Sequence, residues 1–306
     1  MSEKQFDIIV VGAGPAGLTA AIYALRAGKS VLVIERAAFG GQMTFSPKIE
    51  NYPGMVSVSG NELADKMVEQ VINLGGEFEL DEVVRVEDGD IKKVVTEFGS
   101  FNGKAVILAN GVKHRMLGID GEEDLVGDGI SFCAVCDGAF YKGRDVAVIG
   151  GGNSALQEAV LLSEGCSKVT VVQNLAFLTG EKRLAEILES RNNVDIIYNT
   201  VVDSFIVDNG FKGIKIKNTD SGEISTLSCE GVFIAIGLMA ENKAYDSIVD
   251  LDVQGYYASD ESCMTKTAGI FVAGDCRAKR IRQVTTAAAD GSVAALAACR
   301  YIDDQK

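Results

Sequence analysis

Two cysteines carry the plainest chemistry in this sequence. Cys133 and Cys136 stand three positions apart, close enough to close a small disulfide ring. Such a pair can cycle, because one thiol attacks an incoming disulfide and the other resolves the mixed disulfide. The same spacing also binds zinc, but a structural zinc site needs four ligands. The chain has one histidine, His114, and no second pair with this spacing, which favours the redox interpretation.

The residues around and beyond this pair divide into two groups. Asp137 follows the pair directly and is a sensible proton donor and acceptor for thiol exchange, although it is equally suited to a turn before Gly138. Seven cysteines, an odd number in a chain without a secretion signal, argue against a structural disulfide framework. We expect the other five to be small buried residues. They are Cys166, Cys229, Cys263, Cys276 and Cys299.

The chain opens with a strand, a glycine-rich turn, a helix and a second strand. The apolar run 6–11 ends in Gly12-x-Gly14-x-x-Gly17, an amphipathic stretch follows, and the apolar run 31–34 ends at Glu35. In such a unit the first glycine permits a tight turn, the second lets the backbone approach a pyrophosphate, and the third allows close helix packing. Because a helix N-terminus attracts phosphates and Glu35 can accept hydrogen bonds from a ribose diol, we predict a nucleotide site rather than a merely structural turn.

Two later stretches extend this pattern. The unit recurs as an apolar run at 145–149, a turn from Gly150 to Ala155, a helix at 156–164 and a strand at 169–172, so we expect two doubly wound domains. Near the C-terminus, a strand at 270–273 leads to Gly274-Asp275 and then to a helix rich in Ala and Gly, which must pack closely against another element. Asp275 can bind a hydroxyl-rich chain such as the ribityl of a flavin; the alternative is a solvent-facing turn carboxylate.

Composition narrows the class of protein. Hydrophobic residues make up 47% and charged residues 24% of the 306 residues, which is typical of a globular protein. The net charge of −14 argues against a nucleic-acid partner, because a phosphate backbone requires a basic surface. No apolar run reaches the roughly 18 residues that a membrane span needs. Without a signal-peptide pattern at the start, we expect a cytoplasmic protein.

Taken together, these motifs resemble the low-molecular-weight, bacterial-type thioredoxin reductases over nearly the whole chain. The resemblance implies an α/β fold of two Rossmann-like, three-layer (ββα-type) nucleotide-binding domains, one inserted into the other. An FAD-binding domain would span residues 1–117 and 245–306. The inserted domain, residues 118–244, would carry the dithiol and a degenerate pyridine-nucleotide fold. A homodimer and a large rotation between the domains are implied as well. The matching stretches are Gly12 to Gly17, Gly40-Gly41-Gln42, Glu50 to Gly54, Cys133 to Gly138, Gly150 to Ala155, Ile270 to Asp275 and Arg282-Gln283-Val284.

The resemblance also implies roles for particular residues. Carried over by position, Cys136 would face the flavin, Cys133 would attack the disulfide of a thioredoxin, and Asp137 would handle protons. The positions implied to contact FAD are Gly12, Gly14, Pro15, Ala16, Gly17, Glu35, Gly41, Gln42, Asn51, Ala109, Gly111, Gly274, Asp275, Arg282, Gln283 and Val284.

The second nucleotide unit departs from the family pattern. NADPH-dependent members follow its second strand with a His-Arg-Arg run and a further Arg, because guanidinium groups bind the 2′-phosphate bidentately. Here the corresponding three arginine positions are Asn174, Leu175 and Thr179, so no cation remains. An NADH enzyme would place an acidic residue at the strand end, where this chain has Gln173. Lys182 and Arg183 follow, at positions typical of a solvated helix face.

These changes favour a different electron source. The chain resembles the nicotinamide-independent branch of the family, the ferredoxin-dependent flavin thioredoxin reductases of anaerobic bacteria. Because ferredoxins are small and acidic, we expect a basic landing site, and the alternative for each basic run is an ordinary surface patch. The first candidate is Arg277, Lys279, Arg280 and Arg282, and the second is Lys113, His114 and Arg115.

Other functions stay open at this point. The main alternative is an NAD(P)H-dependent thioredoxin reductase with an altered nucleotide pocket. A ferredoxin–NADP⁺ reductase of the same fold would not need the thiol pair, and a redox-sensing flavoprotein would not turn over. A glutaredoxin-like protein or a peroxiredoxin partner is as compatible with the sequence as a thioredoxin.

Overall fold

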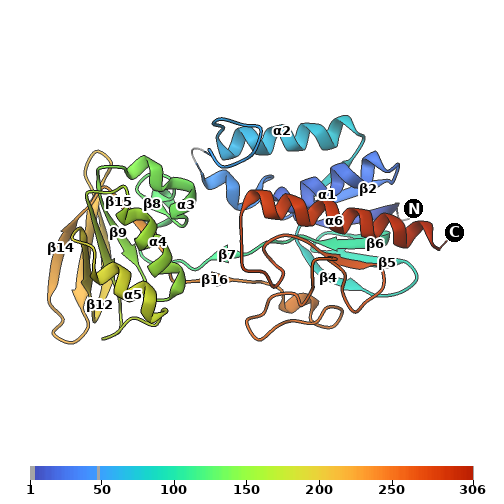
Figure 1. The fold of residues 1–306 in the computed structure, drawn as a ribbon. Helices are drawn as coiled ribbons and strands as arrows, with labels where there is room; N and C mark the ends of the chain where they lie inside the picture. The colour runs from blue at the N-terminus through green and yellow to red at the C-terminus, as the bar shows by residue number, and fades with distance from the viewer. Residues whose placement is uncertain (1–3, 47–48, 306) are drawn as a thin grey trace. The chain divides into compact units, whose positions relative to one another are not determined.

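The computed structural model describes residues 4–46 and 49–305, which fold into two compact units (Figure 1). The outer unit consists of the chain up to residue 113 and from residue 239 onward, and the inserted unit consists of residues 114–238. Each crossing between the units lies a few residues before the boundary expected from the sequence. The two connecting segments pair with each other as a two-stranded sheet of β7 (Lys113–His114) and β16 (Leu238–Met239).

The outer unit is built on one seven-stranded sheet. β3 (Glu77–Leu80), β2 (Val31–Glu35), β1 (Gln5–Val11) and β6 (Ser100–Leu108) run parallel in that order. The last residues of β6 pair in parallel with β17 (Ile270–Val272). Its first residues pair antiparallel with β5 (Lys92–Thr96), which pairs with β4 (Val83–Glu87).

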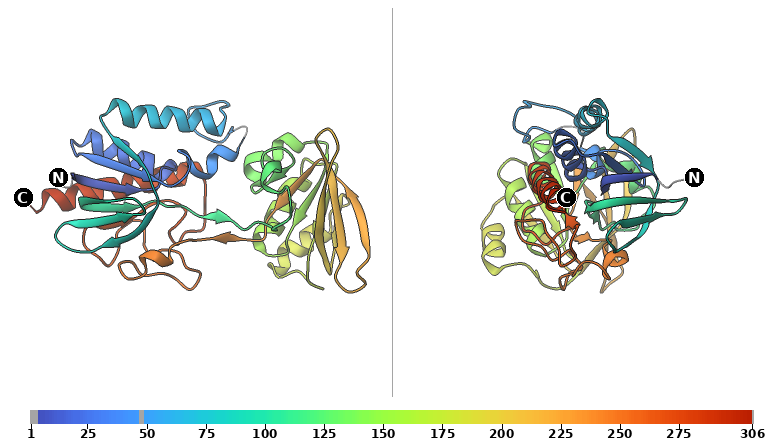
Figure 2. Two further views of the ribbon diagram at one scale, coloured as in Figure 1. Left: turned by 180° about the vertical axis from the view of Figure 1, so that it is seen from behind. Right: turned by 90° about the vertical axis from the view of Figure 1, so that its right-hand side faces the viewer.

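Three helices cover one face of this sheet. They are α1 (Pro15–Arg26), α2 (Gly60–Asn73) and α6 (Val284–Asp303), and the shorter 3-10 helices of the unit are η1 (Gly41–Phe45) and η4 (Lys243–Tyr245). Gly291 of α6 lies so close to α1 that a Cβ there would overlap the Ala16 carbonyl oxygen, so the small residues of α6 serve helix packing, as the sequence predicts. The start of β1 and the end of α6 lie at the same end of the outer unit (Figure 2).

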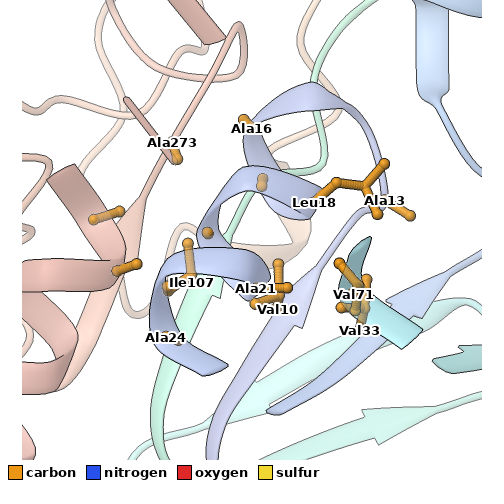
Figure 3. Close-up of a cluster of buried hydrophobic side chains, with 14 of the residues drawn as sticks. Val10, Ala13, Ala16, Leu18, Ala21, Ala24, Val33, Val71, Ile107 and Ala273 are labelled. Carbon is orange, nitrogen blue, oxygen red and sulfur yellow. The ribbon is translucent and has the colours of Figure 1, made fainter. Parts of the chain in front are cut away.

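Alternating side chains on β1 separate two cores. Ile8 and Val10 point to the core shared with the helices, which Figure 3 shows in close-up with Leu18 and the alanines of α1 packed over the strands. Ile9 and Val11 point to a second core on the opposite face, formed with side chains of β4, β5 and the segment 245–257. The outer unit is therefore layered, as the period of two along a strand requires.

Local signals set where the helices begin. α1 begins with Pro15, whose fixed φ suits the first helical position, and no side chain caps its first N–H groups. α2 is capped by Ser59, whose hydroxyl accepts from the Glu62 backbone N–H at 3.1 Å. α6 starts with a capping box between Gln283 and Thr286. Of these three helices, α1 is the one whose start has no capping contact from a side chain.

The inserted unit repeats the plan with a five-stranded parallel sheet. Its order is β11 (Val194–Ile197), β10 (Lys168–Val172), β9 (Asp145–Ile149), β15 (Gly231–Ile234) and β8 (Ile130–Ser131). The helices are α3 (Ala134–Asp137), α4 (Asn153–Ser163) and α5 (Lys182–Glu189), with 3-10 turns η2 (Glu123–Leu125) and η3 (Gly138–Tyr141). A second, antiparallel sheet contains β12 (Thr200–Val207), β13 (Phe211–Asn218) and β14 (Ile224–Ser228).

The central strand β9 lies between these layers. Val146 and Val148 pack into the core with α3 and α4, and Ala147 and Ile149 pack into the core with the antiparallel sheet. The predicted fold class, two three-layer Rossmann-like domains with one inserted into the other, is confirmed. Among residues 4–46 and 49–305, no helix combines the length and the hydropathy that crossing a membrane requires.

Candidate active site

The first glycine turn lies at the carboxyl end of β1, where the chain enters α1. Gly12 has a φ of 101°, which favours glycine, and a Cβ there would lie 2.8 Å from the Ala109 carbonyl carbon. A Cβ on Gly17 would overlap the Gly12 carbonyl oxygen, whereas a Cβ on Gly14 would meet nothing within 4 Å. The turn therefore leaves open space at Gly14, beside the uncapped N–H groups of α1, and this arrangement suits a phosphate.

Glu35 ends β2 beside this turn and also holds it in place. Its Oε2 accepts a hydrogen bond from the Ala13 backbone N–H at 2.8 Å, and its Oε1 accepts one from the Ala37 backbone N–H at 3.0 Å. Glu35, Gly12 and Asn110 line a pocket at the carboxyl end of β1. Each carboxylate oxygen keeps a spare lone pair, so Glu35 can still accept from a ribose diol.

Asp275 has a carboxylate that the protein leaves unsatisfied. Its Oδ1 is buried without a hydrogen-bond partner among the described residues, and the nearest cation, Lys279, lies 3.9 Å away. Burial raises the pKa of Asp275 to about 6, although Lys279 and Arg282 act in the opposite direction. Leaving a buried acceptor unpaired is costly, so the site fits a ligand that donates hydrogen bonds from hydroxyl groups. The Asp275 side chain as a whole is 29% exposed, so the buried Oδ1, and not the whole group, is what distinguishes it from a solvent-facing turn residue.

At two points the backbone of a distant segment lies directly against the turn between β1 and α1. A Cβ on Gly41, at the start of η1, would lie 3.2 Å from the Gly14 Cα. A Cβ on Gly274, which has a φ of 83°, would lie 2.7 Å from the Ala16 Cβ. Segments that are far apart in the sequence therefore meet at the turn between β1 and α1.

The remaining positions predicted to contact FAD lie near the ends of the same strands and helices. Asn51 donates through Nδ2 to Gln283 Oε1 at 3.2 Å. Arg282 donates to the Asp275 carbonyl oxygen at 3.4 Å, and its guanidinium lies 4.2 Å from the centre of the Tyr256 ring. Pro15 and Val284 open α1 and α6, Gly111 follows β6 with a φ of 65°, and Gln42 is exposed in η1.

In the inserted unit, Cys133 and Cys136 are joined as a disulfide with a Cα–Cα distance of 5.3 Å. Cys133 is the N-cap of the short helix α3, and its Sγ accepts from the Cys136 backbone N–H at 3.2 Å. Val135, between them, is 58% exposed, so the ring lies at the protein surface rather than in its core. The other five cysteines are free and buried, as the sequence predicts.

Asp137 is buried next to the disulfide. Its Oδ2 accepts from the Ser131 hydroxyl at 2.6 Å, and the same hydroxyl accepts from the Cys133 backbone N–H at 3.1 Å. Burial raises the pKa of Asp137, although the Ser131 hydrogen bond opposes the rise. Asp137 can therefore exchange a proton more readily near neutral pH than an exposed aspartate. Ser131 was not singled out from the sequence, since only the fold places it there.

The loop after β10 folds back over the second glycine turn. Gln173 is buried there, so close that a Cβ on Gly151 would collide with its amide group, and its Nε2 donates to the Phe177 carbonyl oxygen at 2.9 Å. The backbone N–H groups of Thr179 and Gly180 both donate to the Gly151 carbonyl oxygen, at 2.8 and 2.9 Å. Uncharged groups of the loop thus lie against Gly151, and among the described residues the one charged side chain bonded to the turn is an acid, Glu181, which accepts from Asn153 Nδ2 at 3.5 Å.

The two cations that follow this loop, Lys182 and Arg183, face solvent. Asn174 and Leu175 are exposed and uncharged. Lys182 is 91% exposed and pairs along its own helix with Glu186 at 3.5 Å, and Arg183 is exposed as well. Both cations therefore belong to a solvated helix face.

The structure corrects the first basic landing site. Arg277 and Lys279 are not available to an acidic protein, because their charged groups are buried and both pair with Asp290 of α6 at 2.9 Å. The pKa of Asp290 stays below its ordinary value: burial acts to raise it, and the hydrogen bonds from both cations outweigh that effect. An acid in the middle of a helix of small residues was the available sequence signal. Only Arg280 of this run is exposed.

The second basic run is also weaker than the sequence predicts. Lys113 pairs with Glu241 at 3.0 Å. His114 stacks on Phe132 with ring centroids 4.5 Å apart, and burial lowers its pKa to about 4, so it is uncharged at neutral pH. Lys113 and Arg115 both stay exposed, but Lys113 shares its charge with Glu241.

Comparison with known proteins agrees with this geometry. Residues 6–291 match the family described as pyridine nucleotide-disulphide oxidoreductase. The thioredoxin reductase of Listeria innocua is 42% identical, over 99% of this chain and 96% of that protein. A 34.2 kDa protein in the rubredoxin operon of Clostridium pasteurianum is 40% identical, over 98% of each. The solved thioredoxin reductase of Streptococcus pyogenes superposes with a TM-score of 0.94, at 39% identity over 99% of this chain and 100% of that one.

The fold and the two sites define a flavoprotein disulfide oxidoreductase. The chain belongs to the pyridine nucleotide-disulphide oxidoreductase family, and its cofactor is FAD. The residues present fit this cofactor on three observations: the open space at Gly14, the uncapped start of α1, and the unpartnered buried Oδ1 of Asp275.

Proposed function

We propose that this flavoprotein reduces the disulfide of a thioredoxin, and that ferredoxin rather than a nicotinamide supplies the electrons. The absence of charged side chains in loop 173–180 is the observation that supports ferredoxin, rather than a nicotinamide, as the electron donor. Three charged contacts of about 1.5–3 kcal/mol each are missing, which would weaken NADPH binding by several powers of ten. The thioredoxin half is supported by the relatives from Listeria innocua and Streptococcus pyogenes, which are described as thioredoxin reductases.

The proposed roles of the residues follow from their placement. Bound FAD supplies the chemistry of accepting single electrons and releasing two to a disulfide. Cys136 receives electrons on the flavin side, and Cys133 attacks the thioredoxin disulfide. Asp137, buried and next to Cys136 in the chain, exchanges the proton that accompanies the thiol chemistry. Each turnover delivers two electrons to the thioredoxin disulfide, and the two thiolates that form take up protons from water. Gly12, Gly14, Glu35 and Asp275 are the proposed FAD-binding residues of the outer unit, and the assembly is proposed to be a homodimer.

A protein donor agrees with one further observation. The relative from Clostridium pasteurianum is described by its place in a rubredoxin operon, beside another electron-carrier protein. Residues 277–282 do not form a landing site for ferredoxin, because Arg277 and Lys279 are buried against Asp290.

An NAD(P)H-dependent reductase is the second candidate. The glycine turn after β9 keeps the geometry that a pyrophosphate uses, since Gly150 has a φ of 130° and no side chain caps the start of α4. The turn is compatible with a pyridine nucleotide that is held without charged contacts to its 2′-position.

Steady-state reduction of thioredoxin under anaerobic conditions separates these candidates. The enzyme is mixed with thioredoxin and with reduced ferredoxin, NADPH or NADH in turn. We expect turnover with ferredoxin and at least about 100-fold less with either nicotinamide. Comparable turnover with NADPH or NADH would favour the second candidate. Flavin reduction by ferredoxin without any thioredoxin reduction would contradict the substrate half of the proposal.

A further inference from the structure

Glu158 lies on the face of α4 that packs against the helix of the redox pair. Leu162, one turn after Glu158, lies against Gly138, where an added Cβ would come within 3.2 Å of its side chain. Residues four apart share one face of a helix. The carboxylate of Asp137, which precedes Gly138, acts electrostatically on Glu158, as expected for neighbours across this contact.

Both carboxyl groups have a buried oxygen without a partner. Glu158 Oε2 and Asp137 Oδ1 are buried and accept no hydrogen bond from any described residue. The second oxygen of Asp137 is held by the Ser131 hydroxyl at 2.6 Å. Two neighbouring buried carboxylates cannot both ionise cheaply, because desolvation and like-charge repulsion act together. A proton on one of the two carboxyl groups removes this repulsion and leaves a single negative charge in the pair.

The ionisation of Glu158 follows from this placement. Burial, and then the charge of Asp137, raise the pKa of Glu158 to about 8. Burial also raises the pKa of Tyr141, on the following turn η3, to about 12, so its phenol stays neutral. On the other elements packed against α4, the charged groups pair elsewhere or lie at the surface. These are Lys182 and Glu186 of α5, which pair with each other, Arg183 and Glu189 of α5, which are exposed, Lys168 of β10, which pairs with Asp195, and Asp145 of β9, which is exposed.

We propose that Glu158 carries a proton in the oxidised enzyme and shares it with Asp137, so that the two side chains form a proton reservoir for the Cys133–Cys136 disulfide. Glu158 acts through Asp137 and is therefore a positioning residue. When two electrons open the disulfide, two thiolates form; the single proton of the pair passes through Asp137 to Cys136, and Cys133 remains a thiolate. When the dithiol is reoxidised by its substrate disulfide, Cys136 loses its proton to Asp137 and the reservoir refills. The substrate thiolates take their protons from water. The turnover part of this inference rests on the proposed function.

Infrared spectroscopy tests the reservoir without any donor or thioredoxin. In the oxidised holoenzyme at pH 7 we expect the carbonyl stretching band of a protonated carboxylic acid, which disappears with a midpoint near pH 8 and changes when dithiothreitol reduces the disulfide. Glu158→Gln should lose this band, and Gln157→Ala, an exposed change on the same helix, should keep it. Absence of the band in the wild type, or its persistence in Glu158→Gln, would overturn the proposal.

The pH profile of turnover gives a second readout. Wild-type thioredoxin reduction should fall as the pH rises through about 8, because Glu158 loses its proton there. Glu158→Gln should lose this alkaline limb and slow turnover about tenfold at pH 7, while Glu158→Asp restores part of both. An unchanged flavin spectrum shows that each variant is folded. Superimposable profiles of wild type and Glu158→Gln would refute the role of Glu158 in turnover. If no donor supports turnover but the infrared band behaves as expected, the proposed function fails and the reservoir stands.

Discussion

At the scale of single residues, Asp290 determines what two basic side chains can do. It accepts hydrogen bonds from Arg277 at 2.9 and 3.0 Å, from Lys279 at 2.9 Å, and from the Gly274 backbone N–H at 3.0 Å. These contacts connect α6 to the segment that carries Asp275. The cations are therefore structural, and they hold the turn on which an FAD-binding residue is proposed.

Removing the charge of Asp290 should destabilise the outer unit. Asp290→Asn removes the carboxylate that lies 2.9 Å from both buried cations, and breaking such a buried pair typically costs about 3–5 kcal/mol of unfolding free energy. Glu261→Gln is the matched control, because Glu261 also pairs with Arg277, at 3.6 Å, but its side chain is 99% exposed. That change should cost less than about 1 kcal/mol. Urea unfolding of both variants measures the difference, and equal midpoints would contradict the structural role of Asp290.

The two thiols should separate by function. Cys133→Ser removes the attacking thiol of the proposed relay, so thioredoxin reduction should fall to background while the donor still bleaches the flavin. Cys166→Ala, which changes a buried thiol with a pKa raised by burial to about 11, should retain both activities. Absorption of the flavin and a thioredoxin assay measure the two half-reactions. A stable mixed disulfide formed through Cys136 in the Cys133→Ser variant would show that the roles of the thiols are reversed.

Some of these residues were accessible to prediction and others were not. Short motifs contain the residues that could be predicted: the spacing of Cys133 and Cys136 indicates a redox pair, and the spacing of Gly12 and Gly14 indicates a nucleotide-binding turn. Glu158 and Asp290 belong to no such motif. Their roles could not be predicted from the sequence, because the burial of a carboxylate depends on elements that are distant in the chain and pack against it. The basic run 277–282 was misjudged as accessible for the same reason: its counter-charge comes from the following helix rather than from its own neighbours.

At the scale of elements, the turn between β1 and α1 combines two demands on glycine. Gly17 is required for the protein, because a Cβ would overlap the Gly12 carbonyl oxygen, and Gly14 is open in the protein itself. We therefore expect Gly17→Ala to lower the melting temperature of the apoprotein and Gly14→Ala to leave it almost unchanged. Gly14→Ala should instead weaken FAD binding, since its methyl group occupies the approach to the pyrophosphate. Thermal unfolding and flavin titration of both apoproteins check this, and equal loss of stability would contradict the assignment.

Some of the helices and strands could be predicted from sequence patterns, and others could not. Both strand–turn–helix–strand units appear where the glycine turns predict them, because apolar runs of that length with a glycine turn have few other solutions. Neither β4 and β5 nor the antiparallel sheet of β12, β13 and β14 follows from a motif. Strands β12 and β13 contain bulges that interrupt their register, so their alternation is weak in the sequence.

At the scale of the whole molecule, the net charge of −14 opposes the binding of an anion such as NADPH, so that binding depends on cations placed directly at the site. Restoring arginine at the three family positions, as Asn174→Arg, Leu175→Arg and Thr179→Arg together, should create NADPH-dependent flavin reduction where the wild type has little. The gain should be at least about tenfold and should weaken with salt, because the new contacts are partly exposed. A matched variant with glutamine at the same positions controls for side-chain size. Equal NADPH activity in the arginine and glutamine variants would contradict the electrostatic argument.

The donor of electrons is the centre of the account, and one measurement tests it most directly. Purified holoenzyme is mixed anaerobically, first with NADPH and then with reduced ferredoxin. The absorption of the oxidised flavin is followed through a single reduction. We expect the flavin absorption to remain unchanged after NADPH is added and to decrease rapidly after reduced ferredoxin is added. Rapid bleaching by NADPH alone would contradict this expectation.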